Sequence, residues 1–264
     1  MTHDPRDTPD PALVTRDDPM QIIVPVADLM RKPGGPRDRQ LLLGDAVTVL
    51  HHQHEWRLIR AHKNGYCGYL HATSLGAHGK PTHTVTARAT HAHSAPNIKS
   101  PERTSLSFGS QLTVHTLTDT FAETDHGFVP KQHIDLLENT ATDPVNVAHL
   151  FVGTPYLWGG NSAWGIDCSG LVQTACLACA IPCPGDSDQQ ETHLGARQPP
   201  NTAYRRNDLL FWAGHVAWVV NPTTLLHANA GDMAVAQEPI DAAIARIAAQ
   251  GDGPVTAHKR LNIA

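Results

Sequence analysis

The 264-residue sequence predicts an α+β fold, in which two small β-barrels precede a domain that combines helices with a meander of strands. Three observations support this fold class. Short β-prone runs, separated by Gly, Pro, Asn and Asp, occupy residues 21–78, and a similar set follows in 79–138. Helical and extended patterns then alternate through 139–264. Residues 1–20, rich in Pro, Asp and Thr, are expected to form a mobile tail.

The pattern of the first β unit recurs in the second. The segment "LLLGDAVTVL" at 41–50 corresponds to "LSFGSQLTVH" at 106–115, and "GYCGYLHATSL" at 65–75 corresponds to "DHGFVPKQHI" at 125–134. In both copies a glycine precedes an alternating strand, and a glycine, an aromatic and an aliphatic residue follow about twenty residues later. Two copies of one β unit explain this recurrence.

Three helices and three strands are predicted in the last domain. Apolar residues at helical spacing in "CSGLVQTACLACA" favour a helix that Pro182 and Pro184 end, because proline cannot continue it. The other predicted elements are a short helix at 144–151, strands at 207–214, 215–221 and 224–230, and a helix at 240–250 closed by Gly251. A helix followed by an antiparallel meander is typical of an α+β domain.

Composition and charge exclude several classes of protein. The formal net charge is −5 without any block of Lys and Arg, so nucleic acid is not an expected partner. No apolar run reaches the roughly 18 residues of a membrane span, and the first residues lack the pattern of a secretory signal. Four of the five cysteines lie between Cys168 and Cys183, unlike a secreted disulfide framework. We therefore expect a cytoplasmic monomer that uses no metal and no cofactor.

Cys168 stands at the predicted start of a helix, within "WGIDCSGLVQ". A thiol with the ordinary pKa of about 8.5 attacks poorly, because the thiolate is the nucleophile. A helix N-terminus and a neighbouring imidazole both favour the thiolate. His215, at the start of one predicted strand, and His227, near the end of the next, fall toward the same end of an antiparallel pair. These three residues are therefore a candidate nucleophile, base and orienting residue.

Other cysteines and histidines have simpler interpretations. Cys176, Cys179 and Cys183 lie on the apolar face of the helix or just after it, which favours packing over a metal half-site. The cluster "HHQHE" at 51–55 alternates on an expected surface strand and is interpreted as solvated. Burial in a core is also the simplest interpretation of Cys168 taken alone. Its order and context with two histidines are what favour catalysis.

Three segments then match a known family. "TPYLWGGNSAWGIDCSGLVQ", "NDLLFWAGHVAWVV" and "LLHANA" resemble, in order and distance, the three motifs of the NlpC/P60 cysteine peptidases. The resemblance covers residues 144–264 and implies a papain-like α+β domain that cuts peptidoglycan peptides. It implies Cys168 as nucleophile, His215 as general base and His227 as the polar third member. Backbone N–H groups at the helix start would help to hold the oxyanion.

The two β units resemble bacterial SH3 (SH3b) domains. Two such domains before an NlpC/P60 domain resemble the γ-D-glutamyl-L-diamino acid endopeptidases of the dipeptidyl-peptidase VI type. The resemblance implies murein-derived peptides with a free N-terminal L-Ala as partners, cut before the diamino acid to release L-Ala-γ-D-Glu. It also implies a role in cell-wall peptide recycling, which fits the expected cytoplasmic location.

The free N-terminus sets a chemical requirement, because an ammonium group must be met by carboxylates and other acceptors. The resemblance implies that Tyr156, Asp167 and Ser169 bind substrate from the catalytic domain. From the first SH3b domain it implies a tyrosine and an acid, which correspond to Tyr66 in "NGYCGY" and Asp38 in "RDRQLLLG".

The chain also departs from this subgroup. The subgroup often has Glu at the position of Asp38; Glu55 is an alternative acid, but the strand that begins there favours a structural role for it. Gly185 stands where an arginine commonly follows the proline. The second SH3b unit has few aromatic residues, so we expect it to serve as a scaffold.

Three other functions stay open on the sequence. A papain-like amidase or acyltransferase would keep the thiol chemistry and change the substrate, although the ammonium-binding residues do not suit an acyl lipid. A non-catalytic peptidoglycan-binding module would use the two SH3b units alone. A metal- or redox-responsive protein would use the histidines and the cysteines after Cys168. Neither meso-diaminopimelate nor lysine is favoured as the diamino acid.

Overall fold

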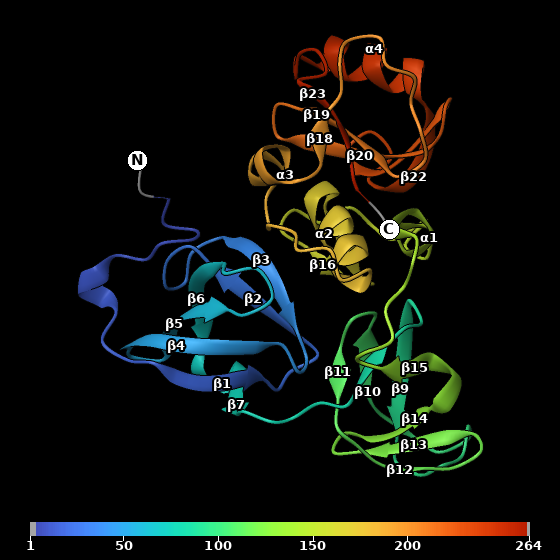
Figure 1. The fold of residues 1–264 in the computed structure, drawn as a ribbon. Helices are drawn as coiled ribbons and strands as arrows, with labels where there is room; N and C mark the ends of the chain where they lie inside the picture. Colours follow the sequence, from blue (N-terminus) through green and yellow to red (C-terminus); the bar gives the residue numbers. More distant parts are fainter. Residues whose placement is uncertain (1–3, 263–264) are drawn as a thin grey trace. The chain divides into compact units, whose positions relative to one another are not determined.

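The described part of the chain, residues 4–262 of a computed structural model, consists of two units (Figure 1). The first ends at Asn139 and the second begins at Thr140, beside the position where the last domain is expected to start. Strands make up the first unit apart from short 3-10 turns, and the second combines four α-helices with a six-stranded sheet. The α+β fold class is confirmed. Residues 1–3 of the expected tail and 263–264 of the last domain lie outside the described residues.

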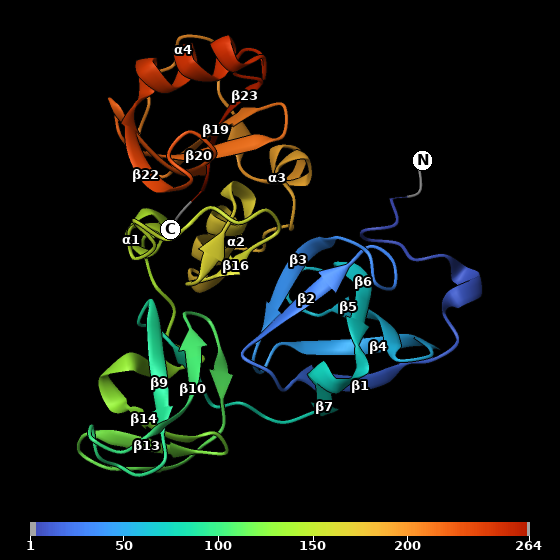
Figure 2. The same cartoon turned by 180° about the vertical axis from the view of Figure 1, so that it is seen from behind.

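Seven strands form the sheet of the first β unit, in the order β3-β2-β6-β5-β4-β1-β7, and Figure 2 shows that this sheet curls. The strands are β1 (Asp18–Ile22), β2 (Val26–Met30), β3 (Arg37–Leu42), β4 (Ala46–Gln53), β5 (Trp56–Ala61), β6 (Cys67–His71) and β7 (Leu75–Ala77), with the 3-10 turn η2 (Ala72–Ser74) before β7. Alternate side chains point inward, where Leu29, Val47 and Ile59 are fully buried in one apolar core. His52 and His54, in the solvated cluster expected at 51–55, are exposed.

The segment before this sheet has secondary structure of its own. Residues 1–20 are expected to form a mobile tail, and η1 (Pro11–Leu13) and the first residues of β1 lie within that range. The backbone N–H of Cys67 donates to the carbonyl of Arg6 at 2.6 Å, and that of Arg16 donates to Leu50 at 3.0 Å. The described part of the segment therefore lies against the first β unit through backbone hydrogen bonds, which residue composition does not reveal.

The second β unit repeats the order of the first at its end. It contains β8 (His83–Val85), β9 (Ala89–His93), β10 (Glu102–Ser107), β11 (Gln111–Leu112), β12 (Val114–Leu117), β13 (Phe121–Thr124), β14 (Gly127–Pro130), η3 (Lys131–His133) and β15 (Ile134–Leu136). The strands form two sheets, β10-β9-β14-β13-β12 and β11-β8-β15. The run β14, η3, β15 has the same order of strand, 3-10 turn and strand as β6, η2, β7. These two runs overlap the recurrent segments at 125–134 and 65–75.

The second unit contains a six-stranded sheet in the order β18-β23-β19-β20-β21-β22 and a two-stranded sheet of β16 and β17. Its elements are α1 (Pro144–His149), β16 (Asn161–Ser162), β17 (Gly165–Ile166), α2 (Cys168–Ala178), α3 (Ser187–His193), β18 (Ala196–Arg197), β19 (Asp208–Trp212), β20 (His215–Asn221), β21 (Thr224–Asn229), β22 (Ala234–Pro239), α4 (Ile240–Gln250) and β23 (Ala257–Arg260). The three helices and three strands expected here are present, and α3, β16, β17, β18, β22 and β23 are additional. None of the helices within residues 4–262 is long and apolar enough to cross a membrane.

Helices cover the sheet of the second unit and position its candidate site. Helix α4 packs against β21 and β22, where Ile240 and Ile247 join Ala217, Val219 and Leu225 in one apolar cluster. Helix α2 packs against β20 and β21 and against α1. The helix that begins with Cys168 and the strands that carry the two candidate histidines are therefore direct neighbours.

Candidate active site

Cys168 is the first residue of α2, and its side chain is buried with 6 % of the residue exposed. Asp167 immediately before it is the N-cap, and its carboxylate accepts a hydrogen bond from the backbone N–H of Gly170 at 2.6 Å. A capping carboxylate satisfies one of the unpaired N–H groups of a helix start. The local sequence therefore places the thiol at the positive end of the helix dipole, where a thiolate is favoured.

The carboxylate of Asp167 joins the loop at Gly159 to the first turn of α2. Besides Gly170, it accepts hydrogen bonds from Ser169 Oγ at 3.2 Å and from the backbone N–H of Gly159 at 2.9 Å. Gly170 is required by close approach, since a Cβ there would collide with the carbonyl oxygen of Gly160. Asp167 and Gly170 thus lock the loop before the helix onto its first turn.

His215 begins β20 after a tight turn of two residues. The turn works because Gly214 adopts a φ of 76°, in the left-handed region that favours glycine. The strands on either side pair at Trp212 and His215. The thiol of Cys168 donates to the carbonyl oxygen of Gly214, with the sulfur 4.0 Å from it. The candidate nucleophile therefore lies against the residue that directly precedes the candidate base.

The two candidate histidines are hydrogen-bonded to each other. His215 Nε2 lies 2.9 Å from His227 Nδ1. The register of β20 and β21, with Trp218 opposite Leu226 and Val219 opposite Leu225, confirms the pairing expected from the sequence. It places His215 and His227 on one face of the sheet as diagonal neighbours. Since His227 is fully buried, its orientation is fixed by packing as well as by the hydrogen bond.

The chain of contacts continues beyond His227. His227 Nε2 lies 3.2 Å from Glu238 Oε2 in β22, and Glu238 receives two hydrogen bonds from Arg246 in α4, at 2.9 and 2.7 Å. Sequence reasoning missed both residues. Glu238 lies on the same face of the sheet as His227, a relationship that only the pairing of β22 with β21 creates.

Burial sets the protonation of this cluster. It lowers the pKa of His215 to about 3 and that of His227 to about 4, from an ordinary value near 6.5. The hydrogen bond from Arg246 lowers the pKa of Glu238. At neutral pH both imidazoles are therefore neutral and the carboxylate is ionised. A neutral His215 has a lone pair with which it can accept a proton.

Tyr156, Asp167 and Ser169 lie in the same unit as the thiol. The backbone of Tyr156 pairs with Ile166, two residues before Cys168, and its N–H donates to the carbonyl of Met233 at 2.8 Å. Ser169 is buried, and its hydroxyl donates to Asp167. The structure thus brings Asp167 and Ser169 into one hydrogen-bonded group at the helix start.

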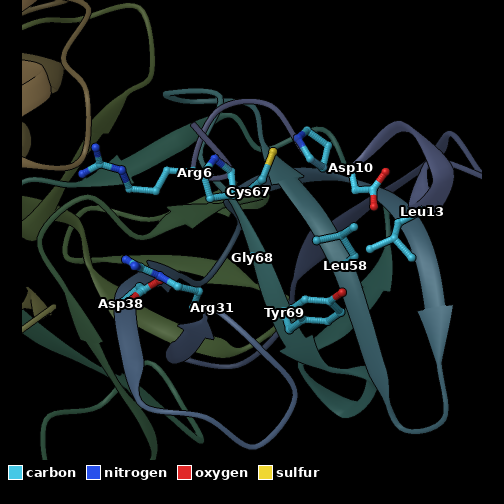
Figure 3. Close-up of a pocket in the computed structure, with 11 residues that line it drawn as sticks. Arg6, Asp10, Leu13, Arg31, Asp38, Leu58, Cys67, Gly68 and Tyr69 are labelled. Atoms are coloured by element: carbon cyan, nitrogen blue, oxygen red, sulfur yellow. The ribbon is translucent and has the colours of Figure 1, made fainter. Parts of the chain in front are cut away.

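Asp38 and Tyr66 belong to the first β unit. Asp38 lines a cavity of about 190 Å³ with Arg31 and Tyr69, and Figure 3 shows Asp38 beside Arg31. Arg31 Nε donates to Asp38 Oδ2 at 2.9 Å, and this hydrogen bond is the main cause that raises the pKa of Arg31, with a smaller effect from Tyr66. Tyr66 is 2 % exposed and belongs to the core of the β unit. Asp38 and Tyr66 therefore both raise the pKa of Arg31, and the carboxylate of Asp38 is paired with this arginine.

Among the described residues, the other cysteines and the alternative acid show no second reactive site. Cys176 and Cys183 are buried, and their mutual contact together with burial raises the pKa of Cys176, as expected of packed thiols. The alternative acid Glu55 is exposed. Within residues 4–262, no group of three or more His, Cys, Asp or Glu side chains is arranged to hold a metal ion.

Comparison with known proteins gives matches to both parts of the chain. Residues 153–247 match the NlpC/P60 family, and residues 29–75 match the bacterial dipeptidyl-peptidase Sh3 domain. A gamma-D-glutamyl-L-lysine dipeptidyl-peptidase of Bacillus subtilis is 28 % identical over 71 % of this chain and 71 % of its own length. Dipeptidyl-peptidase 6 of Lysinibacillus sphaericus is 27 % identical over 76 % of this chain and 83 % of its own length.

Solved structures share the fold. An NlpC/P60 family protein from Bacillus cereus aligns with a TM-score of 0.77 over 92 % of this chain and 99 % of its own, at 20 % identity. An NlpC/P60 endopeptidase from Photobacterium damselae subsp. piscicida aligns with a TM-score of 0.59 over 91 % of this chain and 70 % of its own, at 15 % identity. The first alignment extends over both units of the chain.

Proposed function

We propose, from the premise that the chain combines an NlpC/P60 domain with a bacterial SH3 domain, that it is a cysteine peptidase of peptidoglycan peptides. The bond cut is the one between γ-D-glutamate and the L-diamino acid, in peptides with a free N-terminal L-Ala. The names of the Bacillus and Lysinibacillus relatives support a dipeptidyl-peptidase that acts on a γ-D-glutamyl bond. A peptide with a free L-Ala amine has already left the glycan, which favours a role in recycling in the cytoplasm over remodelling of intact wall.

One observation carries the catalytic part of the proposal. Cys168 Sγ lies against Gly214, and the next residue, His215, is hydrogen-bonded to His227 at 2.9 Å. A nucleophile, a base and a group that orients the base are thus contiguous, which is the arrangement that activates a thiol. The position of Cys168 at the start of α2 adds backbone N–H groups that can stabilise an oxyanion.

These positions support the following reaction. His215 accepts the thiol proton, and the thiolate of Cys168 attacks the γ-glutamyl carbonyl, forming a C–S bond and an oxyanion. The imidazolium of His215 then gives its proton to the leaving amine of the diamino acid as the C–N bond breaks. Water, deprotonated by His215, hydrolyses the thioester and restores the thiol.

Substrate selection rests on the ammonium group in this proposal. Asp38 and Tyr66 in the SH3b domain, with Tyr156, Asp167 and Ser169 in the catalytic domain, are the proposed binding residues. Arg31 forms an ion pair with Asp38. An incoming ammonium group must therefore displace Arg31 from the carboxylate of Asp38 or bind to that carboxylate beside it. The side chain of Arg31 is 62 % exposed, whereas that of Asp38 is 16 % exposed, so the arginine can move into solvent while the carboxylate stays in place.

Mass spectrometry of defined peptides tests the function. L-Ala-γ-D-Glu-meso-diaminopimelate and the corresponding L-lysine peptide are incubated with the protein, beside their N-acetylated forms, intact sacculi and the Cys168→Ala variant. Release of L-Ala-γ-D-Glu from the free peptides alone, lost in the variant, is the expected result. Equal cleavage of the acetylated peptides would remove the ammonium requirement, and cleavage by the variant would remove the thiol mechanism.

A further inference from the structure

Glu238 lies between His227 and Arg246 in the line of side-chain contacts that begins at His215. Its carboxylate contacts His227 Nε2 at 3.2 Å with one oxygen, and Arg246 binds both of its oxygens. The side chain of Glu238 is 16 % exposed. The other charged group that acts on this cluster is Asp232, in the turn before β22, which affects both His227 and Arg246.

The ionisation of Glu238 determines which way its hydrogen bond runs. Arg246 is permanently charged, and its two hydrogen bonds favour the carboxylate over the acid. An ionised carboxylate can only accept hydrogen bonds. The proton between Glu238 and His227 therefore sits on His227 Nε2.

That assignment fixes the next proton. A neutral imidazole carries one N–H, so Nδ1 of His227 has only a lone pair. The hydrogen bond of 2.9 Å to His215 must then be donated by His215 Nε2. His215 is neutral as well and has spent its one N–H, which leaves Nδ1 of His215 as an unprotonated nitrogen.

We propose that Glu238, held by Arg246, is a positioning residue that fixes the tautomers of His227 and His215, so that Nδ1 of His215 takes the proton of Cys168. The step breaks the S–H bond and forms an N–H bond on His215. Glu238 stays ionised throughout and stabilises the imidazolium through His227. The inference rests on the thiol chemistry of the proposed function and not on its substrate.

Two substitutions of Glu238 separate a tautomer effect from a structural one. In Glu238→Gln, the donors of Arg246 take the amide oxygen and the amide NH₂ turns to His227. His227 Nε2 must then accept, its Nδ1–H donates to His215, and His215 carries its proton on Nδ1, where the thiol proton should go. Glu238→Ala imposes neither tautomer.

We expect the more conservative substitution to cause the larger loss of kcat. Glu238→Gln, the more conservative change in shape, lowers kcat by about 100-fold or more, whereas Glu238→Ala lowers it by about 10-fold, with KM little changed in both. Gln250→Ala is the matched control, because Gln250 accepts the other hydrogen bond of Arg246 at 3.0 Å without touching Glu238. This control should keep the full kcat.

A readout without substrate keeps the inference distinct from the proposed function. The rate of alkylation of Cys168 by iodoacetamide, followed by mass spectrometry of its peptide, should fall in the same order as kcat. If no peptide is cleaved by the wild type while alkylation keeps that order, the proposed substrate is wrong and the inference stands. Equal alkylation rates for wild type and a folded Glu238→Gln variant would overturn the inference.

The wild-type protein supplies a test that needs no substitution of Glu238. Nitrogen-15 NMR distinguishes the two tautomers of a neutral imidazole, and the signals of His215 and His227 are assigned by comparison with His215→Gln and His227→Gln. The expected spectrum has both residues protonated at Nε2. Protonation of His215 at Nδ1 in the wild type contradicts the proposal.

Discussion

The sulfur of Cys168 lies 4.0 Å from the carbonyl oxygen of Gly214, the residue directly before His215. This contact joins the start of α2 to the turn before β20, although Cys168 and Gly214 are 46 positions apart in the chain. Because Gly214 forms the tight turn into β20, the same turn that receives the thiol also aims the imidazole. The reactive geometry therefore depends on a helix start and a hairpin turn at once.

Replacement of His215 tests this geometry. His215→Gln removes the proton acceptor while the buried neighbourhood keeps a side chain of similar polarity, so peptide hydrolysis should slow by about 10³-fold or more. His193→Gln is the control, since His193 is an exposed histidine of the same unit. Steady-state kinetics on the L-Ala-γ-D-Glu peptides measures both. Loss of less than about 10-fold in His215→Gln would show that another group accepts the proton.

Asp167 should matter for stability as well as for activity. Asp167→Ala removes a helix cap and leaves the N–H of Gly159 and Gly170 unpaired, which should lower the free energy of unfolding by about 1–3 kcal/mol. Activity should fall too, because the helix start that carries Cys168 is released. Urea unfolding followed by tryptophan fluorescence gives the first quantity. Asp241→Ala, an exposed acid in the first turn of α4, serves as control and should change stability by less than about 0.5 kcal/mol.

Asp38 should affect substrate binding and not the chemical step. Asp38→Asn removes a negative charge from the proposed ammonium site, so KM for the free peptide should rise by about 10-fold while kcat changes little. The matched control is Asp28→Asn, which removes a carboxylate that also contacts an arginine, Arg37, in the same β unit. An unchanged KM for Asp38→Asn, with Asp28→Asn equally silent, would place the ammonium site elsewhere.

The lowered pKa values of the two histidines predict that acid destabilises the second unit. Below about pH 6.5 the unfolded chain binds protons at His215 and His227, whereas the folded unit does so only near their folded pKa values of about 3 and about 4. The free energy of unfolding should therefore fall as pH decreases from about 6.5 to about 4, by up to about 1.4 kcal/mol per pH unit for each histidine.

Denaturation at several pH values checks this sign. The fluorescence of Trp212 and Trp218, both buried in the second unit, follows its unfolding. His227→Gln removes one of the two titrations and should flatten the decline, whereas His193→Gln should not. Parallel pH profiles for wild type and His227→Gln would contradict the folded pKa of His227.

Much of the site was readable from local sequence, because local rules determine it. The apolar spacing after Cys168 and the prolines beyond it predict α2. The order of two strands and their short connection placed His215 and His227 at one end of a hairpin, as the register confirms. Strand periodicity and turn preferences depend on a few neighbouring residues, so they can be recognised in a single sequence.

The tertiary structure decided what lies behind and beside these residues. Glu238 reaches His227 only because β22 joins the sheet and α4 folds back to bring Arg246 to it, a contact of elements that no local pattern fixes. Asp38 is likewise paired with Arg31 across the β2–β3 hairpin, which its sequence neighbours do not reveal. A charged side chain that is buried or half-buried needs a polar partner, because loss of its hydration is costly. Which residue becomes that partner depends on the segments that fold against it. The sequence by itself therefore determined the fold class and singled out the candidate nucleophile and base, and the packing of β22 and α4 decided which groups hold that candidate base.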